Sequence, residues 1–217
     1  GTVFVANGEA KKMKMITDSV LANSVYPTWH PSLPLVAFSS NQTGQVFHLI
    51  DKSKIEVIDY ASDLVLYDVN NNTISNILRT KDYMETFPHW SSDGKRLFFC
   101  RAFTPDLALM PDSVRSDSII PLIDNLHYDV MSMAFDPTTK TFSEPELEVA
   151  CAERGRSAAV PRVSPDGRYL LFTEGKRGQF HIWHPEADLY VKDLQTDSVR
   201  LLSNASGEGP DSYHTWS

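Results

Sequence analysis

The feature that most constrains the fold of this chain is a segment that recurs along it. It is clearest in residues 87–99, FPHWSSDGKRLFF, and again in residues 160–172, VPRVSPDGRYLLF. Residues 26–40 form a copy without the Asp-Gly pair, and residues 213–217 begin a fourth copy. A repeat of this kind has to be interpreted first, because each copy is one structural unit.

Each copy predicts a β-hairpin followed by two further strands. Ser-Asp-Gly and Pro-Asp-Gly favour tight turns, because Asp bonds the nearby backbone and Gly tolerates positive φ. The flanking residues are aromatic and aliphatic, as strands require. Four antiparallel strands per repeat indicate a β-propeller blade. A third strand is predicted over 64–69, 130–135 and 189–194, and, after a polar turn, a fourth over 74–78, 146–149 and 199–202.

We therefore predict an all-β chain, a segment of a β-propeller with four-stranded antiparallel blades, three of them complete and partial blades at both ends. The partial ends indicate a piece of a longer propeller. Two other arrangements fit the same pattern: residues 213–217 could join residues 2–16 in a fourth blade, or two chains could self-associate through open blade edges. The expected boundaries are 1–18 for the end of a preceding blade, 24–80, 85–150 and 158–203 for the complete blades, and 212–217 for the first strand of the next blade.

The motif of residues 88–99, P-x-W-S-x-D-G-x-x-L-x-F, resembles the TolB-type, WD-like propeller repeat. Residues 161–167 match it at the proline and at Ser-Pro-Asp-Gly, but they have Arg162-Val163 in place of a His-Trp pair. The resemblance covers nearly the whole chain and is specific for the fold. It implies a periplasmic or otherwise extracytoplasmic bacterial protein that engages other proteins, and it implies no particular activity, because such blades serve many roles.

Charge and composition exclude some partners. The 217 residues carry a formal net charge of −8, which argues against nucleic acid or an anionic membrane, because both favour basic surfaces. No apolar run is long enough for a transmembrane helix, so no membrane insertion is expected. Cys100 lies in the apolar run LFFC and is expected to be a buried thiol. A disulfide between Cys100 and Cys151 stays open.

Signatures of catalysis and of metal binding are missing from the sequence. It has no Gly-x-Ser-x-Gly elbow, no phosphate-binding Gly-Lys-Ser/Thr loop and no Asp-rich calcium loop. His181 and His184 would share a face on a helix, but residues 180–183 predict strand or loop, where they do not. We therefore predict no catalytic residue, no metal and no cofactor.

Each unit carries an insertion between its second and third strands, over 41–63, 103–129 and 175–188. In a four-stranded meander these loops share one face of the disc, which is often the binding face. Trp183 is interpreted as a recognition aromatic on such a loop. A group of residues around the central funnel is the other candidate. Together the candidate binding residues are Trp183, His181, His184, His48, Arg101, Arg162, His89 and Glu174.

The function predicted from these features is a non-enzymatic, TolB-like propeller scaffold that binds a protein, a small polar ligand or a glycan through the face with the long loops. The alternative is the propeller component of a hydrolase or of a carbohydrate-active enzyme. In that case the catalytic part lies outside this chain or in the central funnel.

Overall fold

The structure is a computed structural model, and it describes residues 4–6, 13–15, 23–41, 45–51, 54–59, 62–104 and 122–216. It describes only the backbone of residues 4–6, 13–15, 23, 41 and 45–51. Within these ranges the regular structure is almost entirely β-strand, with a few short 3₁₀ helices. The protein is therefore all-β, as its repeat predicts.

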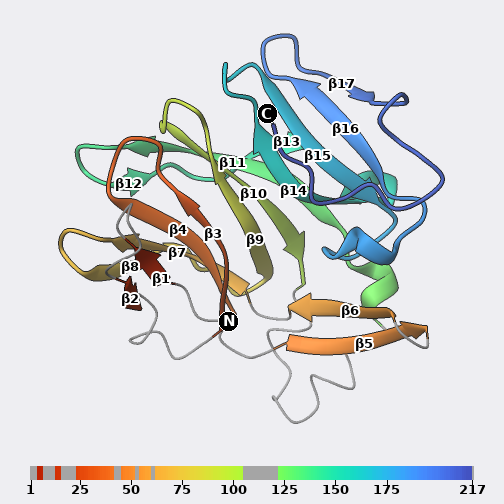
Figure 1. The fold of residues 1–217 in the computed structure, drawn as a ribbon, viewed down its shortest axis with the longest axis horizontal. Helices are drawn as coiled ribbons and strands as arrows, with labels where there is room; N and C mark the ends of the chain where they lie inside the picture. Colours follow the sequence, from red (N-terminus) through yellow and green to blue (C-terminus); the bar gives the residue numbers. More distant parts are fainter. Residues whose placement is uncertain are drawn as a thin grey trace.

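Three antiparallel sheets follow one another along the chain, each beginning with a hairpin and continuing as a meander. Figure 1 shows the three sheets side by side in chain order. In the middle sheet, the short strand β12 pairs with the far end of β11. The first sheet contains β3 (Asn23–Trp29), β4 (Leu35–Asn41), β7 (Ser62–Asp68) and β8 (Thr73–Leu78); the second contains β9 (Tyr83–Trp90), β10 (Arg96–Phe103), β11 (Tyr128–Asp136), β12 (Thr141–Phe142) and β13 (Glu146–Val149); the third contains β14 (Ser157–Val163), β15 (Tyr169–Gly175), β16 (Asp188–Asp193) and β17 (Ser198–Leu201).

The sheets pack face to face. Strand β9 contacts β3, β4 and β7 of the first sheet, and β14 contacts β9, β10 and β11 of the second. Every residue of β7 is buried, which requires packing on both faces, since strand side chains alternate between them. Cys100 and Cys151 are both free thiols in the interior. The cluster between the first two sheets contains Leu35, Ala37, Leu64, Leu66, Trp90, Leu97, Phe99, Met133 and Phe135.

The two ends of the chain were predicted to be parts of further blades. Strand β1 (Phe4–Ala6) pairs with β2 (Met13–Met15) and, among the described strands, with no other. Residues 211–216 are not assigned as a strand, where the sequence predicted one at 212–217. A strand needs a ladder partner, and none of the described strands pairs with this segment. It runs instead beside the third sheet, and the Trp216 indole N–H donates to the carbonyl of Arg162 at 2.9 Å.

The insertions contain structure that the sequence did not indicate. The first insertion forms a separate hairpin of β5 (Gln45–Asp51) and β6 (Lys54–Asp59). The second ends in the 3₁₀ helix η1 (Ile123–Asn125), and its residues 105–121 lie outside the described part. The third contains η3 (His181–Trp183), so the expectation of strand or loop there is corrected: the amide of His184 closes a turn on the carbonyl of His181. Side chains of Ile58, Ile123 and Leu126 join the core of the second and third sheets.

A residue in the left-handed conformation interrupts the first strand of each of the three large sheets, namely β3, β9 and β14. Tyr26, Phe87 and Val160 have φ of 56°, 54° and 53°, a conformation that is uncommon outside glycine. The pairing register with the second strand shifts at the same place in all three sheets. These are β-bulges, in which two residues oppose one. Tyr213 has the same conformation, with φ of 58°, so residues 211–216 repeat the bulge without the ladder.

The turn of the first unit shows how the missing Asp-Gly pair is replaced. In the second unit the Asp93 carboxylate accepts the amide of Lys95 at 3.0 Å. In the first unit the His30 Nδ1 accepts the amides of Ser32 at 3.2 Å and Leu33 at 3.0 Å. Its Nε2–H is then free to donate to the Gly94 carbonyl at 3.0 Å. One imidazole therefore closes its own turn and joins the first sheet to the second.

Gly94→Ala tests this link between sheets. Gly94 has φ of +70° and an added Cβ would press on Cε1 and Nε2 of His30, a ring held against Trp90 and Phe135. Left-handed strain costs about 1–2 kcal/mol, and overpacking costs roughly 1–3 kcal/mol more. Gly155→Ala is the matched control, because Gly155 has φ of +63° and no atom near its Cβ position. We expect Gly94→Ala to lose more unfolding free energy in urea; equal losses would contradict the contact.

Candidate functional site

The insertions of the first and third units contact each other directly. The Trp183 indole N–H donates to the carbonyl of Ile55 at 2.9 Å. His184 Nε2 lies 3.1 Å from the buried carboxylate of Glu56, and Arg177 Nη1 lies 3.7 Å from its other oxygen. The polar side chains of this region therefore bind one another. This bears on three of the residues that the sequence proposed for ligand binding.

His181, His184 and Trp183 are brought together, but as parts of the framework. His181 is fully buried, and its Nε2 lies 3.0 Å from the carbonyl of Arg177. Burial, helped by the nearby His184, lowers the pKa of His181 to about 4. Within the described residues, no group of three or more His, Cys, Asp or Glu side chains is placed to hold a metal ion. His48 lies on β5, of which the structure describes only the backbone.

Glu174 is also committed to internal contacts. Its carboxylate is buried and is bound by Arg154 Nη2 at 2.6 Å and by Arg156 Nε at 3.2 Å. The thiol of Cys151 lies 3.5 Å from the same group. Burial raises the pKa of the Cys151 thiol, and the charge of Glu174 raises it further. Neither side chain is available to a ligand without breaking this cluster.

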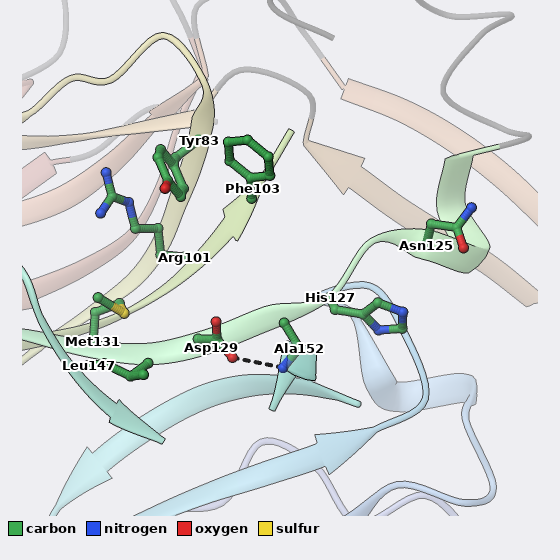
Figure 2. A pocket seen from close by; sticks show the side chains of 9 residues that line it. All are labelled: Tyr83, Arg101, Phe103, Asn125, His127, Asp129, Met131, Leu147 and Ala152. Atoms are coloured by element: carbon green, nitrogen blue, oxygen red, sulfur yellow. Dashed lines mark hydrogen bonds between the residues drawn. The ribbon is translucent and has the colours of Figure 1, made fainter. Parts of the chain in front are cut away.

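A cavity of about 410 Å³ lies where the second sheet meets the insertions. We call it the rim cavity. Figure 2 shows its lining side chains: two aromatic rings and an arginine on one side, and aliphatic side chains below them. Phe103 and Leu147 are 62% and 54% exposed. The described residues that line it are Tyr83, Arg101, Phe103, Asn125, His127, Asp129, Met131, Leu147 and Ala152.

Arg101, proposed from the sequence, is held firmly at the rim cavity. Its guanidinium lies 3.6 Å from the ring centroid of Tyr83, a cation–π contact. Its Nε donates to the buried Glu85 carboxylate at 3.2 Å. Asp129 is occupied as well, since it accepts the amides of Cys151 and Ala152 at 2.7 and 2.8 Å. Arg101 and Asp129 are thus oriented by the protein itself, whereas the buried Nδ1 of His127, also in the lining, has no hydrogen-bond partner in the described structure.

A second cavity, of about 290 Å³, lies on the first strands at their bulges. We call it the inner cavity. Its walls come from β3, β9 and β14, and they include His89 and Arg162, which are 73 positions apart in sequence but were proposed together. Arg101 and Glu174 are not part of it. The lining residues are Tyr26, Pro27, Thr28, Trp29, Pro88, His89 and Arg162.

Sequence reasoning did not identify most of the residues that line the rim cavity. Tyr83, Met131 and Leu147 are ordinary strand residues, and nothing in their local pattern distinguishes them from core positions. The signal that was available is the predicted insertion 103–129, at whose ends Phe103 and His127 lie. Tyr83 is brought to the cavity by its pairing with Phe103, and Met131 pairs there with Leu147. In the described residues no helix has the length and apolar character needed to cross a bilayer.

Comparison with known proteins identifies the fold of the chain but assigns it to no family. No family model and no curated protein matches the sequence. Solved structures do match: TolB from Acinetobacter baumannii, a β-propeller, has a TM-score of 0.55 at 19% identity, over 93% of this chain and 37% of that one. A prolyl endopeptidase has a TM-score of 0.58 at 15% identity, over 93% of this chain and 26% of that one.

A puromycin-hydrolysing peptidase from Mycobacterium tuberculosis also matches, with a TM-score of 0.51 at 13% identity, over 83% of this chain and 23% of that one. The chain thus spans well under half the length of these neighbours. At such low identities the likeness concerns the fold alone. The three repeated antiparallel sheets and these neighbours agree that the chain has a β-propeller fold.

Trp183→Phe tests whether Trp183 belongs to the framework. The variant keeps the ring but loses the hydrogen bond to Ile55, which is worth about 1 kcal/mol. We expect amide hydrogen exchange in β5 and β6 to become several-fold faster, with the three sheets unchanged. Trp29→Phe is the control, since Trp29 is 52% exposed and lies at the end of β3, in the first sheet. Unchanged exchange in Trp183→Phe would contradict the structural role.

Glu85→Gln tests the buried carboxylate behind Arg101. Burial raises the pKa of Glu85 from 4.5 to about 7, against the opposing effects of Thr80 and Arg101. The folded state then holds more protons than the unfolded state between these values, so stability falls as pH rises from about 4.5 to 7. Between pH 4.5 and 7 we expect the free energy of unfolding, measured in urea, to fall by about 2–3 kcal/mol less in the variant than in the wild type. The exposed Glu144→Gln should behave as the wild type; a wild-type slope in Glu85→Gln would refute the shift.

Proposed function

We propose that this chain is a non-enzymatic binding module, a segment of a β-propeller scaffold that recognises a protein partner through the rim cavity. The observation that carries the proposal is the chemistry of that cavity. It combines aromatic and aliphatic walls with an arginine fixed by Glu85 and Tyr83. None of the described lining residues is a Ser, Thr, Cys or Lys, so no such nucleophile is present among them.

A protein side chain fits this cavity better than a polar metabolite does. Tyr, Phe, Met and Arg are enriched where proteins bind one another, and all four residue types are in the lining. The exposed Phe103 and Leu147 offer apolar surface that gains from being covered. A cavity of about 410 Å³ is within the range of ligand pockets. A small polar ligand or a glycan is the weaker alternative, because the lining presents mainly aromatic and aliphatic surface.

The position of the cavity agrees with binding on the insertion side of the propeller. Phe103 is the last residue of β10, and His127 comes just before β11, so both border the second insertion. By the likeness to TolB, we propose a periplasmic location for the whole protein. The net charge of −8 supports a protein partner over nucleic acid.

The second candidate is the propeller component of a hydrolase or of a carbohydrate-active enzyme. It is supported by the peptidases among the fold neighbours. It is also supported by the inner cavity on the first strands, because a residue of the central funnel would contact a substrate there. Under this alternative the catalytic residues lie in another part of a longer protein. Assays with fluorogenic peptides and aryl glycosides test whether this chain itself is catalytic. We expect no turnover above that of heat-denatured protein.

Selection of displayed random peptides on the chain tests the binding proposal. We expect selected peptides to share an aromatic or aliphatic anchor residue, and Leu147→Ser to weaken their binding by about tenfold, in line with loss of a buried apolar contact. Leu201→Ser is the matched control, because Leu201 is 41% exposed on the fourth strand of the next sheet. Selected peptides that bind Leu147→Ser and wild type equally would refute the rim cavity as the binding site.

A further inference from the structure

Arg162, in the inner cavity, has no acidic partner among the residues that the structure describes. Among the described residues, the hydrogen bond of its guanidinium runs from Nη1 to the carbonyl of Pro161, at 3.0 Å. Within the described part of the chain no carboxylate pairs with it, and burial lowers the pKa of its guanidinium from the usual value. Other partly buried arginines do pair with carboxylates: Arg101 with Glu85 and Arg156 with Glu174. Among the described residues Arg200 also has no carboxylate partner, but it lies exposed on β17.

The two histidines near Arg162 do not compensate its charge. Burial, followed by the positive charge of Arg162, lowers the pKa of His89 to about 4. The same causes, in the same order, lower the pKa of His214 to about 4. Both rings are therefore neutral at pH 7, and each is hydrogen-bonded to the backbone. Arg162 remains protonated, since the pKa of a guanidinium starts far above 7.

A half-buried cation without a counter-ion is costly, because water solvates it incompletely. A bound anion would recover that cost. The planar guanidinium fork matches a carboxylate with two parallel hydrogen bonds. The single positive charge of Arg162 balances one negative charge, whereas a dianionic phosphate would leave a negative charge unpaired in a chain of net charge −8.

We propose that the inner cavity binds a carboxylate group through Arg162, with apolar atoms of the same ligand against Trp29 and Tyr26. The cavity volume of about 290 Å³ leaves room for several carbon atoms beside the carboxylate, since a water molecule occupies about 30 Å³. The carboxylate can come from a small free acid or from a peptide. This site is separate from the rim cavity and does not depend on the function proposed there.

The test compares hexanoate with hexanamide, which has the same shape without the charge. Binding is followed by tryptophan fluorescence, because Trp29 lines the cavity and Trp216 bonds the carbonyl of Arg162. We expect wild type to bind hexanoate about tenfold more tightly than hexanamide, as a charge-assisted pair allows. A tripeptide with a free C-terminus, compared with its amide, shows whether peptides are accepted. Inorganic phosphate should bind more weakly than hexanoate.

Two variants of Arg162 separate charge from geometry. Arg162→Gln should remove the preference for hexanoate, and Arg162→Lys should keep part of it, because the charge stays and the fork is lost. Arg200→Gln is the control for an unpaired, exposed arginine, and it should bind as wild type does. Circular dichroism verifies that each variant is folded; if Arg162→Gln is not, Arg162→Lys carries the test.

Three results would overturn the proposal. The first is equal binding of hexanoate and hexanamide by wild type, which includes the absence of saturable binding of either. The second is an unchanged preference for hexanoate in a folded Arg162 variant. The third is tighter binding of phosphate than of hexanoate, which would assign the cavity to another class of anion.

Discussion

A left-handed residue within the first strand of each sheet is the constraint on which both cavities depend. In the second sheet the bulge at Phe87 shifts the pairing of β9 with β10 by one residue. On the N-terminal side of the bulge in β9, Arg101 pairs with Glu85 and Phe103 pairs with Tyr83. Without the shift these partners would be Thr86 and Met84. The ion pair and the aromatic pair that form the rim cavity therefore depend on a backbone feature several residues away.

The same bulges form the inner cavity. Its lining residues are those at and directly after the left-handed positions of β3 and β9, with Arg162 from β14. A non-glycine residue in this conformation costs about 1–2 kcal/mol, so other contacts must hold it. Phe87 and Val160 are almost fully buried, and the rings of Tyr26 and Phe87 lie 4.2 Å apart. Core packing thus stabilises the strained backbone that shapes the cavity.

Much of this fold could be predicted from the sequence, because its signals are local. The Asp-Gly turns are where they were expected, and the three insertions begin and end within a residue or two of the predicted positions. The bulges could not be predicted, since Tyr26, Phe87 and Val160 are residues that normally avoid positive φ. The role of His30 was hidden for a related reason: an imidazole that replaces an Asp turn has no sequence signature.

The candidate site was harder to predict, because it depends on which charges are already paired. His184 and Glu174 have chemistry that suits a ligand, but Glu56, Arg154 and Arg156 occupy them. Arg162 and His89 have the same kinds of side chain, and here no carboxylate in the described residues completes the pairing. Residue type alone cannot separate these cases, whereas three-dimensional pairing can. A binding site in such a scaffold is expected where the internal balance of charge and hydrogen bonding is left incomplete, because only there does a ligand add an interaction without displacing one.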